Sequence, residues 1–189
     1  MVNLATAERR KYEDCWSYSQ YRNYSPGVWA LPLFRQLVRK RGTLIDLGCG
    51  TGRAGAELAE AGFEVTLMDF ADNCLDFKVK QKGLPFIRGN LWSPWKGAGR
   101  FDYGYCCDVL EHIPPDKVDK VLRRIFAHCD RVFLNIHFGP DNFGKVVGHP
   151  LHLTVQPFVW WLAKLGEYGD VRDARDLLGM GAFFVSSKC

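Results

Sequence analysis

A short glycine-rich stretch, "LIDLGCGTGRAG" from Leu44 to Gly55, constrains this chain more than any other part of its sequence. An apolar run leads into the stretch, and a helix-forming run, "GRAGAELAEAG", leads out of it. A strand, a glycine loop and a helix in this order build the nucleotide sites of α/β proteins, because glycines let the backbone approach a ligand closely. The stretch therefore predicts an α/β fold with a nucleotide-like ligand at this loop.

Strand-like and helix-like patterns alternate along the rest of the chain, which predicts a parallel sheet with helices on both faces. The predicted strands are 43–47, 64–70, 85–89, 101–107, 131–138, 167–173 and 181–188, and the helices between them are 52–62, 71–82, 115–129 and 154–166. The last two strands are joined by a connection shorter than the dozen or so residues that a crossover needs. We therefore predict a doubly wound, mostly parallel seven-stranded sheet whose last strand is antiparallel and pairs with the strand before it.

The first 41 residues precede this alternation and are expected to form a helical cap. Tyr12, Cys15 and Trp16 share one face of a predicted first helix. "YSPG" at 24–27 predicts a turn, and Pro32 predicts the first residue of a second helix that Gly42 ends. We expect a single domain over 1–189, with the cap at 1–41 and the ligand-binding core at 42–189.

Length and cysteine usage limit the classes of protein that fit. The 189 residues suit one domain with a full apolar core. No apolar run approaches the roughly 20 residues that span a bilayer, and the N-terminus lacks an apolar signal core. The seven cysteines are scattered without a C-x-x-C motif, which favours a reducing compartment over a disulfide scaffold or a zinc site. We predict a cytoplasmic protein with no membrane partner.

The net charge of +4 is unevenly distributed. Residues 1–41 hold eight Lys or Arg against three acidic residues, so this segment is +5 and the rest of the chain is close to neutral. A basic segment of this kind can face phosphates, although a solvated helix face is the more common explanation.

Two cofactors are compatible with the glycine loop. Gly50-x-Gly52-x-x-Gly55 matches the dinucleotide fingerprint, whereas Gly48-x-Gly50-x-Gly52 preceded by Asp46 matches a different nucleotide loop. An acid at the loop would repel a pyrophosphate but attract the sulfonium and ammonium groups of S-adenosylmethionine. Gly48 also follows the strand directly, while Gly50 comes two residues late. The loop therefore favours S-adenosylmethionine.

"IDLGCGTGR" (45–53) is similar to the first motif of the class I S-adenosylmethionine-dependent methyltransferases. Three further segments are similar to this family in the same order: "IRGNLWS" (87–93) to the segment at the adenine, "FDYGYCCDVLEHIPPDKV" (101–118) to the strand-four motif of the small-molecule branch, and "HLTVQPFVWWLAKLGE" (152–167) to the segment around the last helix. The resemblance covers roughly residues 40–189. It implies the Rossmann-like class I methyltransferase fold, with S-adenosyl-L-methionine as the cofactor.

The resemblance also implies the cofactor-binding residues. Asp69 lies where the family has its ribose-binding acid. Asn90 replaces an acid at the adenine, and its carbonyl oxygen can still accept a hydrogen bond from the exocyclic amine. The predicted cofactor-binding residues are Asp46, Gly48, Cys49, Gly50, Gly52, Asp69, Phe70, Asn90, Leu91 and Asp108.

Candidate catalytic and substrate residues lie outside the glycine loop. Asp108 follows the fourth strand, where it would face the cleft. His112 can act as a general base, because histidine titrates near neutral pH, or it can pin the loop; the structural role is favoured. The candidate substrate residues are Tyr21, Arg22, Tyr24 and His152, and Trp92 and Trp95 either cover the adenine or pack in the core.

We expect no metal, because His149 and His152, with His137 nearby, have no carboxylate or cysteine at ligand spacing beside them. The implied enzyme aligns a nucleophile behind the activated sulfonium methyl group and excludes water. A small-molecule substrate is expected. Three alternatives stay open: an RNA methyltransferase that uses the basic N-terminal segment, a non-catalytic S-adenosylmethionine-binding module, and an NAD(P)-dependent oxidoreductase.

Overall fold

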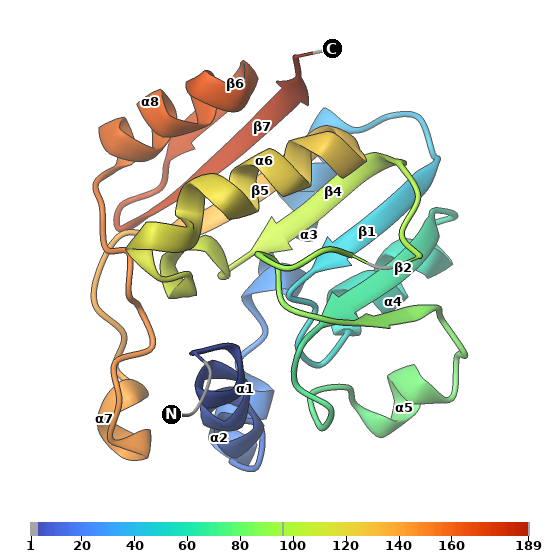
Figure 1. Cartoon of the computed structure of the whole chain (residues 1–189). Coiled ribbons are helices and arrows are strands. Elements are labelled where there is room, and N and C mark those ends of the chain that lie inside the picture. Colours follow the sequence, from blue (N-terminus) through green and yellow to red (C-terminus); the bar gives the residue numbers. More distant parts are fainter. Residues whose placement is uncertain (1–3, 96, 189) are drawn as a thin grey trace.

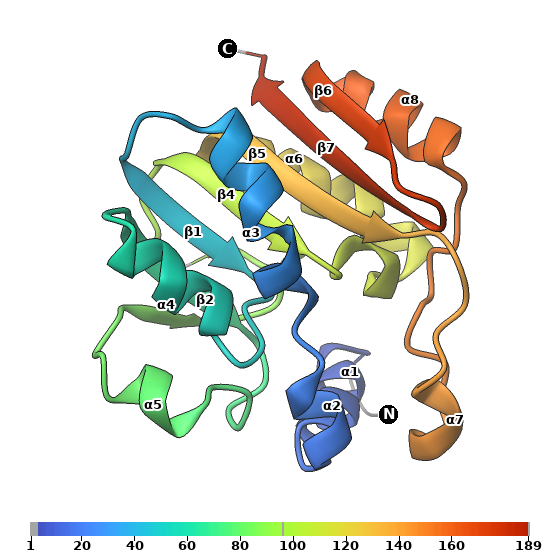
Figure 2. The same cartoon turned by 180° about the vertical axis from the view of Figure 1, so that it is seen from behind.

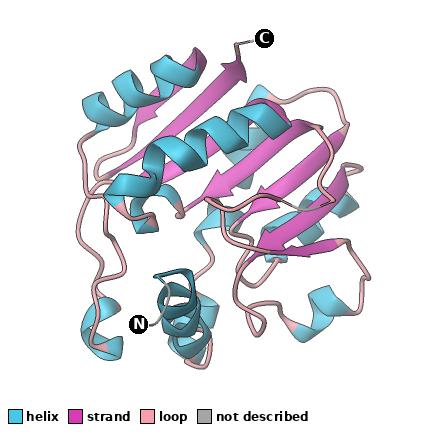
Figure 3. Cartoon of the chain, viewed as in Figure 1, coloured by secondary structure: helices cyan, strands magenta, loops and turns pink. Residues whose placement is uncertain are grey.

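A computed structural model describes residues 4–95 and 97–188 and shows one seven-stranded sheet with helices packed on both faces (Figures 1 and 3). The strands are β1 (Thr43–Leu47), β2 (Glu64–Asp69), β3 (Phe86–Arg88), β4 (Phe101–Cys107), β5 (Cys129–His137), β6 (Gly169–Asp176) and β7 (Met180–Ser187). The α-helices are α1 (Leu4–Cys15), α2 (Ser19–Asn23), α3 (Pro26–Leu37), α4 (Arg53–Glu60), α5 (Phe77–Lys80), α6 (Val118–His128), α7 (Gly144–Val147) and α8 (Phe158–Tyr168). Two 3₁₀ turns, η1 (Leu110–His112) and η2 (Pro115–Lys117), precede α6.

The strand order is β3-β2-β1-β4-β5-β7-β6, and the predicted fold class is confirmed. The five strands from β3 to β5 are parallel, whereas β7 is antiparallel to both β5 and β6. The antiparallel last strand follows from the short β6–β7 connection, as predicted. The chain runs outward in opposite directions from β1 and from β4, so the sheet has its topological switch point between these two strands, beyond whose carboxyl ends such folds bind ligands.

Two apolar layers hold the helices on the sheet. Helices α6 and α8 cover one face and α3 and α4 cover the other (Figures 1 and 2). Side chains alternate between the layers: in β1, Leu44 packs with the α3 side, and Ile45 packs with the α6 side. Trp161 of α8 and Phe34 of α3 are fully buried in their layers. The strands are therefore fixed on both faces, which makes their carboxyl ends a rigid support for the loops that follow.

The second predicted helix was placed wrongly. Helix α3 begins at Pro26 rather than Pro32, so the predicted turn at 24–27 overlaps its first turn and Pro32 lies inside it. Both prolines fit a helix start by sequence alone, because either could supply the fixed φ of a first residue. Burial of Leu31 and Phe34 against the sheet favours the longer helix. Tertiary packing thus overrides the local preference against an internal proline.

The predicted helix 71–82 is reduced to the single turn α5. Side chains hold residues 71–76 in an irregular path. The Asp69 Oδ1 atom accepts a hydrogen bond from the Ala71 N–H at 2.9 Å, and the Asp76 carboxylate binds Arg22 and Arg53. These interactions compete with helical hydrogen bonds. At the other end of the chain, α8 extends through Tyr168, so β6 starts later and runs further than the predicted strand 167–173.

The N-terminal helices α1 and α2 lie beyond the carboxyl ends of the parallel strands, beside α7 (Figures 1 and 2). A third apolar cluster anchors them: Tyr12 and Cys15 pack with Ala71, Cys74 and Leu151. Helices α1 and α2 of the predicted cap 1–41 therefore cover the edge of the sheet where the switch point lies, whereas α3 of the same segment packs on a face of the sheet. No helix in the described ranges is long and apolar enough to cross a membrane.

Candidate functional site

The loop after β1 requires its glycines. Gly48, Gly50 and Gly52 have φ values of 68°, 51° and 74°, a backbone region that glycine adopts without steric cost. An added Cβ atom at Gly48 would lie 2.6 Å from Val109 Cγ2, and one at Gly50 would lie 2.7 Å from the Trp16 ring. Backbone conformation and close neighbours therefore both require glycine at these positions, and the turn that follows α1 contacts the loop through Trp16.

A matched pair of substitutions separates the effect of the left-handed backbone from that of the close neighbouring atoms. Gly83 has a similar φ of 65° but has no atom within 4 Å of an added Cβ. We expect Gly83→Ala to destabilise the chain by about 1–2 kcal/mol, the cost of a left-handed L-residue. Gly48→Ala should cost more, because Val109 must also move. Urea unfolding of both variants measures the difference, and equal losses would show that the Val109 contact has no energetic weight.

A first cavity runs from the loop along the ends of β2 and β3. It is lined by Gly48, Asp69, Phe70, Asn90, Leu91, Asp108 and Trp92, so the structure brings together six of the predicted cofactor residues. Asp69 is buried, which raises its pKa, and its Oδ2 atom accepts a hydrogen bond from the Gly50 N–H at 3.0 Å. The buried Oδ1 atom of Asn90 has no hydrogen-bond partner among the described residues, so it is available to accept one from a ligand. Of the two tryptophans that could cover the adenine, Trp92 lines this cavity, whereas Trp95 packs against the His128 ring.

A second cavity lies on the other side of the loop, where Asp46 meets Cys49, Tyr21 and Tyr24. Asp46 is only 4% exposed, and burial raises the pKa of its carboxyl to about 7. Its Oδ2 atom has no hydrogen-bond partner, and no Lys or Arg of the described residues forms an ion pair with it. A buried carboxylate without a cation is costly, so a cationic ligand in this cavity would be strongly stabilised.

A third cavity opens between α2 and the segment around α7. Its lining includes Tyr21, Tyr24, His137, Phe143 and His152. Tyr21 and Asp108 border all three cavities. Three of the four predicted substrate residues, Tyr21, Tyr24 and His152, therefore lie here, next to the predicted cofactor residues.

The fourth predicted substrate residue, Arg22, is engaged elsewhere. Its guanidinium group donates hydrogen bonds to the Asn73 and Cys74 carbonyls at 2.9 and 3.0 Å and pairs with Asp76 at 2.7 Å. Asp76 also binds Arg53 of α4 at 2.6 Å. Arg22 therefore ties α2 to the loop before α5, and the geometry gives it a structural task in place of a contact with any of the three cavities.

Asp108 has an unusual backbone at the point where the cavities meet. Its φ is 58°, which is uncommon outside glycine and recurs at functional sites. Its N–H donates a hydrogen bond to the Asn135 carbonyl at 2.8 Å, so β5 holds this conformation. Burial alone would raise the pKa of Asp108, but its interactions with His112 and then His152 hold that pKa below the ordinary value. Asp108 thus lines the cavities, and its lowered pKa favours the ionised carboxylate there.

His112 is tied to the N-terminal segment. Its Nδ1 atom lies 2.7 Å from the Tyr12 hydroxyl of α1, and its ring packs edge-on against Tyr12 and His152. This contact supports the structural role favoured from the sequence. Tyr12 was predicted only as a residue on the first helix's inner face, because nothing local relates it to a histidine 100 residues later.

Sequence reasoning missed the importance of Glu111, which is fully buried beside Asp108 and His112. Its Oε1 atom accepts a hydrogen bond from the His137 N–H at 2.6 Å, and its backbone carbonyl accepts from the N–H groups of Leu153 and Thr154. Burial, and then the nearby Asp108 charge, raise the pKa of Glu111 well above its ordinary value. Its second carboxyl oxygen, Oε2, has no hydrogen-bond partner in the part of the chain that the structure describes.

The reason given for expecting no metal is wrong. His152 does have carboxylates beside it, since Asp108, Glu111 and His112 converge on it. The spacing argument failed because these ligands come from the turn after β4, about 40 residues earlier in the chain. His149, by contrast, is exposed and lies outside this group.

The doubly wound sheet, its glycine loop at the switch point and the acid that ends β2 define an α/β protein that binds a nucleotide-type cofactor. The family model of the methyltransferase domain matches residues 20–175, and the chain belongs to this family, the class I S-adenosylmethionine-dependent methyltransferases. The resemblance stated from the sequence is thereby confirmed.

Two individual relatives share at most about a third of their residues with this chain over the matched regions. The chain is 30% identical over 108 residues to a putative methyltransferase, YqeM, of Bacillus subtilis, covering 54% of this chain and 41% of that one. It is 27% identical over 127 residues to the ubiquinone biosynthesis O-methyltransferase of Bordetella avium, covering 61% and 50%. The chain thus spans about half the length of these curated relatives.

A solved structure shares the fold. The 1,6-didemethyltoxoflavin-N1-methyltransferase of Burkholderia thailandensis, solved with 1,6-didemethyltoxoflavin and S-adenosylhomocysteine, superposes with a TM-score of 0.71 at 18% identity, over 97% of this chain and 89% of that one.

Proposed function

We propose that this chain transfers the methyl group of S-adenosylmethionine to a hydroxyl oxygen of a small molecule. The observation that carries the proposal is that Tyr21 and Asp108 line the first, second and third cavities alike, so these cavities adjoin there. A methyl donor on one side and an acceptor on the other would face each other there. An O-methyltransferase among the relatives supports oxygen as the acceptor, and small-molecule methyltransferases among the relatives and structural neighbours support the substrate class.

The residues of the first two cavities suit the parts of this cofactor. Asp69 can accept hydrogen bonds from ribose hydroxyls, and the free Oδ1 atom of Asn90 can accept one from the adenine amine. Asp46 can pair with the positive methionine end. The bound cofactor supplies an activated sulfonium methyl group. The chain's own task is to hold donor and acceptor in line and to exclude water, for which Tyr12 and Trp16 lie over the first cavity.

The direct test is a substrate screen with cofactor labelled at the methyl group. We expect label to appear in one or more low-molecular-weight hydroxyl compounds, with one S-adenosylhomocysteine formed for each methyl transferred. Binding of the cofactor without any transfer, across hydroxyl, amine and thiol panels, would favour the non-catalytic module instead.

The structure weakens the RNA alternative. Four basic residues of the N-terminal segment already pair with acids: Lys11 with Glu8, Arg9 with Glu13, Arg22 with Asp76 and Arg35 with Glu57. We therefore predict only weak RNA binding at physiological salt. Fluorescence anisotropy over a salt series measures this, because neutralised phosphates give a steep salt dependence. Sub-micromolar affinity with a steep slope that is lost on removal of residues 1–41 would restore RNA as the substrate.

The expected compartment also stays a proposal. All six cysteines within the described residues are free thiols, and five of them are buried. Unpaired cysteines are typical of reducing compartments, which supports the cytoplasm.

A further inference from the structure

Four side chains with metal-binding atoms converge beside the third cavity: Asp108, His112 and His152 line it, and Glu111 is fully buried next to them. One ligand atom of each lies within 4.8 Å of those of all the others. Asp108 directly follows β4, Glu111 and His112 belong to η1, and His152 lies in the segment before α8. Two imidazoles with two carboxylates form a donor set that suits a divalent transition metal.

Hydrogen bonds fix the outer atoms of these side chains and leave the inner atoms free. His152 Nδ1 lies 2.6 Å from the Gly139 carbonyl oxygen, which can only accept, so Nδ1 carries the proton and Nε2 keeps its lone pair. Glu111 Oε1 accepts a hydrogen bond from the His137 N–H, whereas Oε2 is buried without a hydrogen-bond partner among the described residues. Such second partners on the far side of each ligand are the usual support of a metal site.

His112 and Asp108 complete the same pattern. His112 Nδ1 is hydrogen-bonded to the Tyr12 hydroxyl, and the other ring nitrogen, Nε2, lies 3.9 Å from Asp108 Oδ2. This distance is too long for a hydrogen bond. In the described part of the chain, neither Asp108 nor Glu111 forms an ion pair with a Lys or Arg. Two carboxyl groups thus lie side by side without a paired Lys or Arg, an arrangement that a bound divalent cation would stabilise.

We propose that Asp108, Glu111, His112 and His152 bind one divalent transition-metal ion, and that this ion takes the acceptor oxygen of the substrate as a further ligand. The second part rests on the proposed function, whereas metal binding does not. The site borders the point where the three cavities meet, through Asp108. An ion there would orient a hydroxyl group toward the cofactor and lower the pKa of that hydroxyl.

Manganese is the appropriate probe. A second cluster, Cys49, Asp69 and Cys74, has its ligand atoms within 4.8 Å of one another, and its thiols would compete for zinc. Manganese prefers oxygen and nitrogen ligands, so it reports on the proposed site. The experiment is a calorimetric titration of Mn²⁺ into the full chain after chelator treatment, with the bound ion confirmed by electron paramagnetic resonance.

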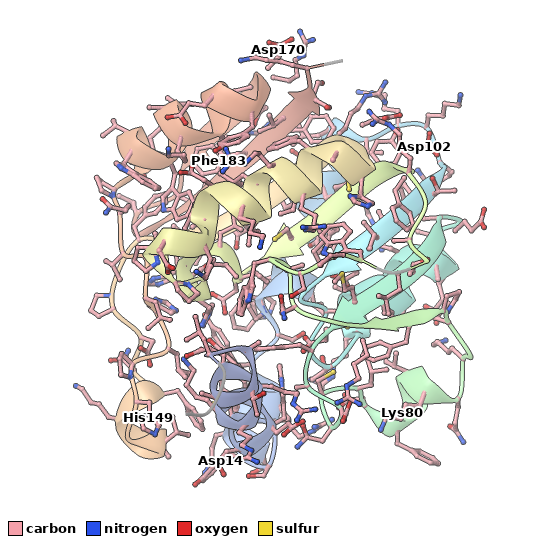
Figure 4. All side chains as sticks on the ribbon, in the orientation of Figure 1. Asp14, Lys80, Asp102, His149, Asp170 and Phe183 are labelled. Atoms are coloured by element: carbon pink, nitrogen blue, oxygen red, sulfur yellow. The ribbon has the colours of Figure 1, made fainter. Side chains whose placement is uncertain are left out.

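Three variants make the test specific. Asp108→Asn keeps the side-chain shape, and asparagine tolerates the left-handed backbone of this position. His152→Gln removes a ligand that is only half-buried. His149→Gln is the matched control, because His149 is exposed beside α7, outside the cluster (Figure 4). Circular dichroism checks that each variant is folded.

We expect one Mn²⁺ per chain, with affinity lowered at least about tenfold in Asp108→Asn and His152→Gln and unchanged in His149→Gln; substitution of even an outer partner has an effect of this size. A folded chain that binds S-adenosylmethionine but no Mn²⁺, or that binds Mn²⁺ equally in all variants, would overturn the metal site. Binding of Mn²⁺ without methyl transfer to any compound would leave the site intact and would contradict the substrate role instead.

Discussion

Asp46→Asn should weaken S-adenosylmethionine binding while it stabilises the unliganded chain at neutral to alkaline pH. Asparagine keeps the size of the side chain but removes its charge. The attraction to the positive methionine end of the cofactor is then lost, whereas adenosine, which lacks that part, should bind almost as before. If Asp46 were only a structural element of the loop, both ligands would bind more weakly.

The pH dependence of this effect has a definite sign. Burial raises the pKa of Asp46 from 3.8 to about 7 in the folded chain, so the folded state holds a proton that the unfolded state has already released. The unliganded chain should therefore lose stability as pH rises from about 4 to about 7, by up to roughly 4 kcal/mol at 1.36 kcal/mol per pKa unit. The Asp46→Asn variant should lack this contribution.

Cofactor binding should show the complementary trend. A cationic ligand favours the ionised carboxylate, so affinity should increase up to about pH 7 and then level off. Calorimetry at pH 7 in buffers of different ionisation enthalpy should detect the release of about half a proton on binding. Asp102→Asn is the control: Asp102 lies at the opposite end of the sheet (Figure 4), bound to Thr43, and its loss should leave cofactor affinity unchanged. Proton release that persists in Asp46→Asn would assign the titration to another group.

His112→Ala should lower the melting temperature and the turnover together, with cofactor affinity nearly intact. The substitution removes the hydrogen bond to Tyr12 and the buried packing against His152. A loss of about 1–2 kcal/mol, each kcal/mol corresponding to about 2–4 °C for a chain of this size, is expected. Thermal unfolding and steady-state turnover give the two readouts.

Tyr12→Phe separates the structural role from general-base catalysis. It removes the same hydrogen bond but keeps the imidazole. If His112 holds the N-terminal segment over the cleft, both variants should lose stability and turnover. A turnover loss of roughly 10²–10⁴ in a fully stable His112→Ala protein that keeps its Mn²⁺ affinity, recovered at high pH and absent in Tyr12→Phe, would show instead that His112 is a general base.

The sheet and its topology were predictable because local patterns determine them. Alternating strands and helices predicted the parallel core, and the short β6–β7 connection predicted the antiparallel β7. The errors fall where long-range contacts override local preference. Residues 71–76 have a helical pattern, but there the Asp69 side chain accepts a hydrogen bond from the Ala71 N–H, and Asp76 binds Arg22 and Arg53 from other elements. Pro32 read as a helix start, but burial of the residues around it extends α3 across it.

The predicted site divides in the same way. Glycine positions and acids at strand ends follow from the motif, and the structure places Asp69 and Asn90 in the first cavity and Asp46 in the second. Contacts made by the cap were beyond sequence reasoning, since Trp16 reaches the glycine loop and Tyr12 reaches His112 only through tertiary structure. The group of Asp108, Glu111, His112 and His152 was missed for the same reason.

Calorimetric titration of the unmodified chain with S-adenosylmethionine, S-adenosylhomocysteine and NAD tests the central claim most directly. We predict binding of the first two at dissociation constants on the order of micromolar, about −8 kcal/mol, and no binding of NAD. Asp69→Ala should weaken both by on the order of 1.5–3 kcal/mol, because a charged hydrogen-bond acceptor for the ribose is lost. Tight binding of NAD together with no binding of the sulfonium cofactor would contradict the account.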